Sequence, residues 1–152
     1  MSDLVFRRAN RTDLPAIIAL LADDEIGRTR EDSGTPSNPR HEDAFRAIDQ
    51  DPNQFFAIVE KAGTTIGCLQ LTFIPGLSRL GMWRGQIESV RVAKSHRGQS
   101  LGDQMLNWAI ETCRQHHCGL VQLTTDVRRL DARRFYEKHG FKASHAGMKL
   151  DL

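Results

Sequence analysis

One stretch past the middle of the chain joins an alternating segment, a basic glycine-bearing turn and a long amphipathic segment. Residues 87–92 alternate in the manner of a β-strand, and residues 101–114 repeat apolar side chains with the period of a helix. Where a strand turns into a helix, the first N–H groups of the helix are unpaired and carry partial positive charge. Such a turn can hold a phosphate or diphosphate, and Arg97 adds a guanidinium beside it. The segment therefore favours an α/β fold with a site for a phosphorylated ligand.

Other uses of a glycine-bearing turn compete with this interpretation. No Lys-Ser or Lys-Thr follows the glycines, as a P-loop would require. A dinucleotide-binding fold would place Gly-x-Gly-x-x-Gly near the start of a βαβ unit, whereas three strand-like runs precede this turn. The remaining alternative is structural, with Gly98 forming the turn and Ser100 capping the helix. The local pattern alone leaves that alternative open.

A second motif follows another strand-like run at residues 120–125. Residues 130–141 read LDARRFYEKHGF. Together, the two motifs resemble the GNAT N-acetyltransferase superfamily, in which the cofactor turn reads Gln/Arg-x-x-Gly-x-Gly/Ala and the later motif reads Asn-x-x-Ala-x-x-Phe-Tyr-x-x-x-Gly-Phe. The resemblance runs from about residue 87 to residue 141, and residues 123–145 look nearest to small-molecule members such as aminoalkylphosphonate N-acetyltransferases. Two positions depart from the family pattern: Ser100 replaces a glycine, and Asp131 replaces an asparagine while keeping a helix-capping side chain.

The resemblance implies a single α/β (α+β) acetyltransferase domain over residues 1–152. Its sheet would be mixed and mostly antiparallel, with about six or seven strands and about four helices packed on both faces. The strands expected from the chain's own pattern are 4–9, 55–61, 64–74, 87–92, 120–125 and two more within 141–152, separated near Gly147. The expected helices are one capped by Thr12, one at 41–50, one beginning at Leu101 and one at 131–139. Long loops at 25–40 and 75–85 would flank the acceptor cleft.

The resemblance also implies acetyl-CoA as the acetyl donor, with its diphosphate at the turn and its pantetheine arm along strand 87–92. It assigns cofactor binding to Val90, Arg91, Val92, Arg97, Gly98, Gln99, Ser100, Leu101, Gly102, Asp103 and Asp131. The acceptor would be the primary amine of a small molecule, attacking directly in a ternary complex. A backbone N–H near Val90 would stabilise the oxyanion of the tetrahedral intermediate.

Glu88 is the candidate general base, acting directly or through water on the protonated amine. Period-two alternation predicts that Glu88 shares a face of its strand with Val90 and Val92. The alternative is a surface glutamate paired with Arg84 or Arg91.

Tyr136 is the candidate general acid. In the resembling family, the equivalent hydroxyl lies near the cofactor sulfur and donates a proton to the departing thiolate. The alternative is a tyrosine that packs beside Phe135 and keeps its hydroxyl in water. A basic cluster precedes and overlaps this motif, and part of it would meet the nucleotide's 3′-phosphate; its members are Arg128, Arg129, Arg133 and Arg134.

Composition and residue spacing exclude several classes of partner and ligand. A net charge of +2 without a polybasic segment excludes a nucleic-acid-binding arm. No apolar run approaches the ~20 residues of a membrane helix. The three cysteines are an odd number without regular spacing, which favours reduced thiols and a cytoplasmic location. The neighbouring His116 and His117 would point apart on a helix and have no companion ligand cluster, so no metal is expected. The family resemblance alone suggests a homodimer.

Two alternative functions remain open beside a small-molecule acetyltransferase. One is a non-catalytic acyl-CoA-binding or sensing module that retains the cofactor site, and the presence of both Glu88 and Tyr136 argues for the enzyme instead. The other is a protein-lysine acetyltransferase, although the chain has no obvious peptide-docking extension. Arginines occur in both long loops and acidic residues occur at Asp23, Asp24, Glu25 and Glu31, so charge alone does not choose the acceptor.

Overall fold

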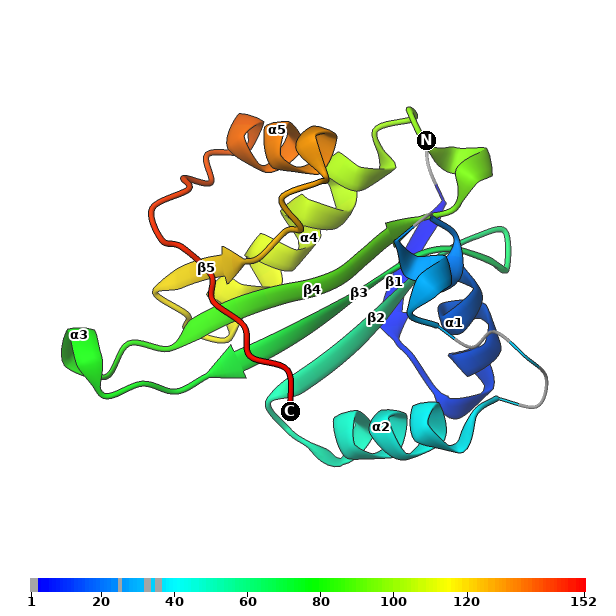
Figure 1. Ribbon diagram of the computed structural model, residues 1–152, viewed down its shortest axis with the longest axis horizontal. Helices are drawn as coiled ribbons and strands as arrows, with labels where there is room; N and C mark the ends of the chain where they lie inside the picture. The colour runs from blue at the N-terminus through cyan, green and yellow to red at the C-terminus, as the bar shows by residue number, and fades with distance from the viewer. Residues whose placement is uncertain (1–2, 25, 32–33, 35–36) are drawn as a thin grey trace.

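A computed structural model describes residues 3–24, 26–31, 34 and 37–152. Five strands of this part of the chain form one sheet in the order β1-β2-β3-β4-β5 (Figure 1). The strands are β1 (Leu4–Arg8), β2 (Gln54–Lys61), β3 (Thr64–Ile74), β4 (Arg84–Val92) and β5 (Leu120–Leu123). The helices are α1 (Leu14–Ala22), α2 (Pro39–Gln50), α3 (Ser78–Gly81), α4 (Leu101–Gln115) and α5 (Leu130–Lys138). Neighbouring strands are antiparallel except β4 and β5, which are parallel, so the expected mixed α/β fold is confirmed.

The two faces of the sheet bury different helices. On one face, α4 contributes an apolar stripe to the larger core, where Met105 and Ala109 are fully buried beside Leu69 and Leu71. On the other face, α1 and α2 cover Ile58 and Cys68. The stripe predicted along residues 101–113 is thus the packing surface of α4, as its helical spacing requires. Both helix layers fix the position of β4, the strand that carries the first motif.

Close contact between β4 and α4 depends on Gly85. A Cβ atom at this position would lie 2.3 Å from Cys113 Sγ, and both residues are buried. Real Cβ atoms do not approach a sulfur so closely, so any side chain at position 85 would push α4 away from the sheet.

The Gly85→Ala variant is therefore expected to lose about 2–3 kcal/mol of unfolding free energy, as overpacked cores do. Urea unfolding followed by circular dichroism measures this loss. Gly147→Ala is the matched control, because a Cβ there meets nothing within 4 Å. Adding Cys113→Ala to Gly85→Ala removes the obstructing sulfur and should recover part of the stability. Equal stability of Gly85→Ala and the parent protein would contradict this packing.

Two local expectations differ from the structure. The first helical turn is capped by Asn10 and not by Thr12, because Asn10 Oδ1 accepts from Thr12 N–H at 2.9 Å. In the same turn, the Asp13 carboxylate accepts from Asn10 N–H at 2.7 Å. The second difference is the C-terminal segment. Residues 141–152 form no strand, so the sheet has five strands among the described residues and the expectation of six or seven was too high. An apolar alternation makes a strand only where a neighbouring strand supplies hydrogen bonds.

The two long loops contain short ordered turns. The 25–40 loop includes the turn Gly27–Thr29 and the start of α2, whereas residues 25, 32–33 and 35–36 of that loop lie outside the described part of the chain. The 75–85 loop contains α3, which projects at the tip of the β3–β4 hairpin in Figure 1. No helix among the described residues has the length and apolar character to span a bilayer.

Candidate active site

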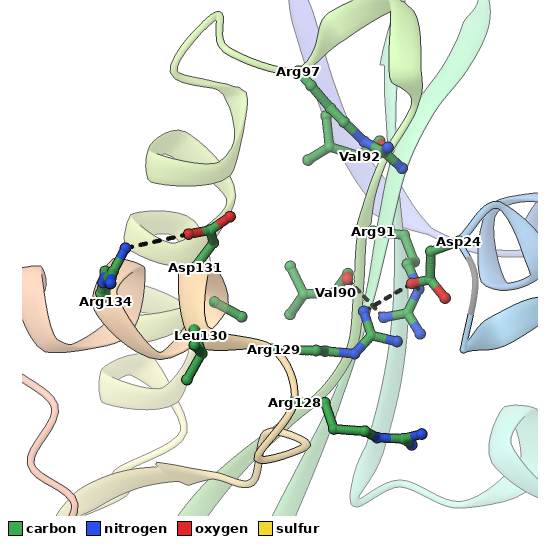
Figure 2. A pocket seen from close by; sticks show the side chains of 11 residues that line it. Asp24, Val90, Arg91, Val92, Arg97, Arg128, Arg129, Leu130, Asp131 and Arg134 are labelled. Atoms are coloured by element: carbon green, nitrogen blue, oxygen red, sulfur yellow. Dashed lines mark hydrogen bonds and ion pairs between the residues drawn. The ribbon is translucent and has the colours of Figure 1, made fainter.

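The candidate site lies where β4 and β5 separate. The two strands pair only between Arg84–Ile87 and Leu120–Leu123, whereas β4 continues to Val92. A pocket of about 690 Å³ occupies the gap between the free part of β4 and the start of α5 (Figure 2). The pocket is lined by Asp24, Val90, Arg91, Val92, Arg97, Arg128, Arg129, Leu130, Asp131, Ala132 and Arg134. Five of the predicted cofactor residues are among these: Val90, Arg91, Val92, Arg97 and Asp131.

The open side of β4 presents backbone groups to this gap. Ala93 N–H donates to Ile66 O of β3 at 2.8 Å, and backbone groups alternate in direction along a strand. The N–H and C=O of Val92 and Val90 therefore point away from β3, toward the pocket. Their carbonyls accept from the guanidinium of Arg97 at 3.1 Å and of Arg91 at 2.9 Å, respectively. A ligand with amide groups can add to such a strand edge as a further strand would.

A β-bulge at Ser89 determines on which face of the sheet the candidate base Glu88 lies. Ser89 has φ +56°, and the β3–β4 register shifts at this point, so Glu88 lies opposite Gln70. Glu88 thus shares the α1–α2 face with Cys68 and Gln70, whereas Val90 packs against the core on the α4 face. The predicted sharing of a face by Glu88, Val90 and Val92 is therefore wrong, because an unmarked bulge breaks the alternation.

Glu88 is exposed and accepts a hydrogen bond from Gln86 Nε2 at 3.2 Å. Neither Arg84 nor Arg91 pairs with it in the described residues; Arg91 instead lies 3.8 Å from Asp24. Glu88 does not line the pocket. The bulge leaves it on the α1–α2 face of the sheet, opposite Gln70.

The turn before α4 has the properties of an anion-binding site. Ser100 occupies the N-cap position in the left-handed region (φ 60°, ψ 13°), and its side chain makes no capping bond. The structural alternative of a serine cap is therefore wrong, and the first N–H groups of α4 receive no side-chain acceptor from it. Gly98 also has positive φ, at 74°. Arg97 is held beside the turn by Val92 O and by Asp23, whose carboxylate lies 3.5 Å from it.

Several residues of the turn lie outside the pocket lining. Leu101 is buried in the core, and Asp103 contacts His139 Nε2 at 2.9 Å and so ties the start of α4 to the end of α5. The other turn residues that do not line the pocket are Gly98, Gln99, Ser100 and Gly102.

The strained serine gives a direct prediction. A non-glycine residue in the left-handed region costs roughly 1–2 kcal/mol of folding free energy. Glycine removes this strain, but its greater freedom in the unfolded chain offsets about 0.5–1 kcal/mol of the gain. Ser100→Gly should therefore raise the unfolding free energy by about 0.5–1 kcal/mol and also tighten acetyl-CoA binding, because the serine side chain no longer crowds the seat. Urea unfolding and calorimetry measure the two effects. Ser95→Gly, in the neighbouring turn but without positive φ, should give no gain. A Ser100→Gly variant no more stable than the parent would refute the strain.

The pocket carries a strong positive charge. Its lining contains five arginines and two aspartates, which leaves a net charge of +3. Asp24 accepts from Arg129 at 2.7 Å across the gap, as Figure 2 shows. Burial raises the pKa of the Asp24 carboxyl, but hydrogen bonds from Gly27 N–H and Arg129 outweigh burial, so the pKa lies below its ordinary value. Asp24 is therefore ionised at neutral pH and orients two of the arginines.

Asp131 does not cap α5, contrary to expectation. The N-cap position belongs to Arg129, and Asp131 lies in the first turn with its exposed carboxylate 3.6 Å from Arg134. In Figure 2 these two side chains lie on the α5 side of the gap, opposite Val90. Three members of the predicted basic cluster line the pocket, whereas Arg133 pairs with Glu137 at 2.9 Å on the helix surface.

Tyr136 lies behind the pocket wall on α5. Its ring packs edge-on against Phe135 and Phe141, with centroids 5.3 and 5.8 Å away. Burial raises the pKa of the Tyr136 hydroxyl above its ordinary value of 10.0, although the charges of Arg91 and Arg129 partly oppose the rise. Both arginines line the pocket, whereas Tyr136 is not part of the lining.

Sequence reasoning gave Asp24 no role beside the cofactor. Asp24 is 105 residues from Arg129 in the sequence, and an acid directly after a helix carries no local signal for such a partner. Among the described residues, no three histidine, cysteine or acidic side chains lie together in a group that could hold a metal ion.

Comparison with known proteins gives one family and several relatives. The Acetyltransferase (GNAT) family profile matches residues 17–141. Aminoalkylphosphonate N-acetyltransferase of Salmonella typhimurium is 37% identical over 68% of this chain and 66% of its own length. Glucosamine 6-phosphate N-acetyltransferase of Trypanosoma brucei is 36% identical over 61% of each chain. This chain thus spans just under two thirds of the length of these relatives. A crystal structure of a transcriptional regulator from Bacillus halodurans is 42% identical, with a TM-score of 0.95 over 98% of this chain and 99% of that one.

Proposed function

Because the chain belongs to the acetyltransferase (GNAT) family, we propose that it transfers the acetyl group of acetyl-CoA to the primary amine of a small molecule. The observation that carries the proposal is the gap between β4 and β5, where a pocket of net charge +3 adjoins the uncapped start of α4. The GNAT family uses acetyl-CoA as its acetyl donor. Its thioester supplies the activated acetyl group.

The residues present suit that donor. The diphosphate would lie at the turn from Arg97 to Gly102, against the first N–H groups of α4. The amide groups of the pantetheine arm match the N–H and C=O groups that Val90 and Val92 direct into the gap. Arg91 Nε is buried without a hydrogen-bond partner among the described residues, so the lining retains an unused donor. A backbone N–H beside the bulge, at Val90, would stabilise the oxyanion.

Tyr136 would donate the proton that the departing thiolate requires. Its raised pKa keeps the phenol protonated at neutral pH, as an acid must be before the reaction. Glu88 would remove the proton of the amine from the opposite face of β4, directly or through water. Because Glu88 lies on the α1–α2 face of the sheet, its position supports approach of the acceptor from that side.

That side of the sheet carries a hydrogen-bonded row of polar side chains next to Glu88. Gln122 Nε2 donates to Gln86 Oε1 at 2.8 Å, and Gln54 Oε1 accepts from Gln70 Nε2 at 2.9 Å. Amide side chains of this kind can bind the polar groups of a small acceptor. A surface of this kind suits a small polar amine.

We further propose that the acceptor carries an anionic group. Asp126 accepts from Arg128 at 2.7 Å and from Arg30 at 3.3 Å, so two guanidinium groups share one carboxylate and one positive charge is left over. Arginine binds phosphate and phosphonate through paired N–H groups. The two enzymes named above act, by their names, on an aminoalkylphosphonate and on glucosamine 6-phosphate, both amines with such an anion.

A second candidate function is an acyl-CoA-binding module without turnover. It is favoured by the transcriptional regulator that shares 42% of its residues and nearly the whole fold with this chain. It requires the same cofactor pocket but no role for Glu88 or Tyr136.

One experiment separates the two functions. Calorimetric titration with acetyl-CoA tests the pocket, and release of free thiol with separate pools of aminophosphonates, amino sugar phosphates, polyamines and simple primary amines tests transfer. Binding with acceptor-dependent thiol release, greatest for the anionic amines, is the expected result. Binding without release in any pool would support the sensing module, and release only with uncharged amines or polyamines would refute the anionic acceptor.

We propose a cytoplasmic site for this reaction. The three cysteines form no disulfide in the structure, and an odd number of cysteines without regular spacing is typical of proteins of a reducing compartment.

A further inference from the structure

A row of four uncharged polar side chains crosses the α1–α2 face of the sheet beside Glu88. Its members, taken from β5 to β2, lie directly opposite one another in the register: Gln122, Gln86, Thr72 and Gln54. All are half-buried, so each is expected to form hydrogen bonds. On the β2 side, Gln54 Oε1 accepts from Thr72 Oγ1 at 3.0 Å and from Gln70 Nε2 at 2.9 Å. That half of the row does not involve Glu88.

The other half of the row forms a directed chain of hydrogen bonds that ends at Glu88. Gln122 Nε2 donates to Gln86 Oε1 at 2.8 Å, and Gln86 Nε2 donates to Glu88 Oε1 at 3.2 Å. A glutamine amide has one acceptor oxygen and one donor nitrogen, whereas an ionised carboxylate only accepts. The bond from Gln122 occupies the oxygen of Gln86, so the nitrogen of Gln86 faces Glu88. Gln122 therefore orients Gln86 in the way that a carboxylate partner requires.

Gln86 is the side chain that holds the carboxylate of Glu88 within the described part of the chain. Glu88 is exposed, and no basic side chain of the described residues forms an ion pair with it. Its backbone is held by the neighbouring bulge, where Cys68 Sγ donates to Ser89 O at 3.6 Å. A glutamate side chain loses much rotational freedom when it is confined to one rotamer. Gln86 confines one carboxylate oxygen and leaves the charge in place, because an amide is neutral.

We propose that Gln86 is a positioning residue for the general base, and that Gln122 acts on the base through Gln86. The proposal rests on the proposed transfer reaction, in which Glu88 removes a proton from the acceptor amine. With Glu88 Oε1 held by Gln86, Oε2 accepts this proton, directly or through water. A base that is already oriented lowers the entropic part of the reaction barrier. Loss of the Gln86–Glu88 bond should therefore slow transfer without weakening the binding of acetyl-CoA.

Steady-state kinetics with acetyl-CoA and either aminoethylphosphonate or glucosamine 6-phosphate tests this role. Gln86→Met keeps a similar length and removes the donor, so it should lower kcat about tenfold and leave both KM values within about twofold. Gln122→Met should act in the same direction but less strongly, since Gln86 remains. Thr72→Val is the matched control. It removes a hydroxyl directly opposite Gln86 that donates to Gln54, so kcat should stay at the parent value.

A double-mutant cycle separates the positioning of the base from a merely structural role. In a Glu88→Gln background, which lacks the base, Gln86→Met should cause no further loss of kcat. An equal loss of kcat in both backgrounds would show that Gln86 acts independently of Glu88, and would overturn the proposal. A raised KM for the acceptor at unchanged kcat would also overturn it, because Gln86 would then bind the acceptor. Far-UV circular dichroism verifies that each variant is folded.

Nuclear magnetic resonance tests the Gln86–Glu88 bond without any turnover. In proton–nitrogen correlation spectra, the side-chain amide of Gln86 should shift when Glu88→Ala removes its acceptor, whereas the amide of Gln54 should not. A protein that transfers acetyl groups but shows no such shift would contradict the positioning role alone. A protein that shows the shift but transfers no acetyl group would contradict the proposed function, and with it the catalytic purpose of the bond. The two failures are thus distinguished.

Discussion

The Tyr136→Phe variant is expected to transfer acetyl groups about 100-fold more slowly than the parent, because a positioned general acid contributes roughly that factor or more. Phenylalanine keeps the ring that packs against Phe135 and Phe141 and removes only the hydroxyl. The dissociation constant of acetyl-CoA should therefore stay within about twofold of the parent value, since the lost interaction forms only as the thiolate departs. Steady-state kinetics and calorimetric titration give the two numbers.

The pH profile adds an independent readout for the same residue. Burial raises the pKa of Tyr136 above 10.0, so the acid is fully protonated at neutral pH and is lost only as the pH rises beyond that value. If this ionisation sets the alkaline limb of activity, the limb should begin above pH 10. Tyr136 is the single tyrosine of the chain, so the ultraviolet absorbance of tyrosinate reports its titration directly. Unchanged turnover in Tyr136→Phe would remove the hydroxyl from the mechanism.

The Gly102→Asp variant is expected to bind acetyl-CoA at least about tenfold more weakly, which corresponds to about 1.4 kcal/mol. Gly102 lies in the first turn of α4, where the N–H groups and helix dipole favour an anion. A carboxylate at this position would stand beside Asp103 and repel the diphosphate. The effect should appear in the dissociation constant measured by calorimetry, and should diminish as salt concentration rises.

Two variants separate charge from bulk. Gly102→Ala adds a Cβ that meets the ring of Phe135 at 3.5–3.6 Å, an ordinary contact, so its affinity should remain near that of the parent. Asn107→Asp adds the same charge to an exposed position further along α4 and should leave binding unchanged. Parent-like affinity of Gly102→Asp would exclude the turn as the diphosphate seat.

The sequence predicted the elements whose signals are local. The spacing of apolar residues in α4 and the alternation of β2 and β3 depend on neighbours a few residues away, and all three elements formed where expected. The basic turn at Arg97 and the first part of the second motif also came together at one pocket. Such features follow from short-range periodicity and from the parallel pairing of β4 and β5.

What the sequence could not predict depends on contacts between distant residues or on unmarked backbone geometry. Serine rarely adopts positive φ, so nothing in the pattern around Ser89 indicated the bulge that reverses Glu88. The ion pair of Asp24 with Arg129 joins two loops that only the folded sheet brings together. Residues 148–152 have the alternation of a strand, but no strand among the described residues pairs with them.

We propose that the gap between β4 and α5 holds coenzyme A in an orientation that directs its acyl end toward Tyr136. A crystal structure of the protein with acetyl-CoA tests this orientation. The diphosphate should contact the N–H groups at the start of α4, and the pantetheine should lie along Val90 and Val92. Density for the coenzyme at another surface, or an empty gap at saturating acetyl-CoA, would contradict this binding mode.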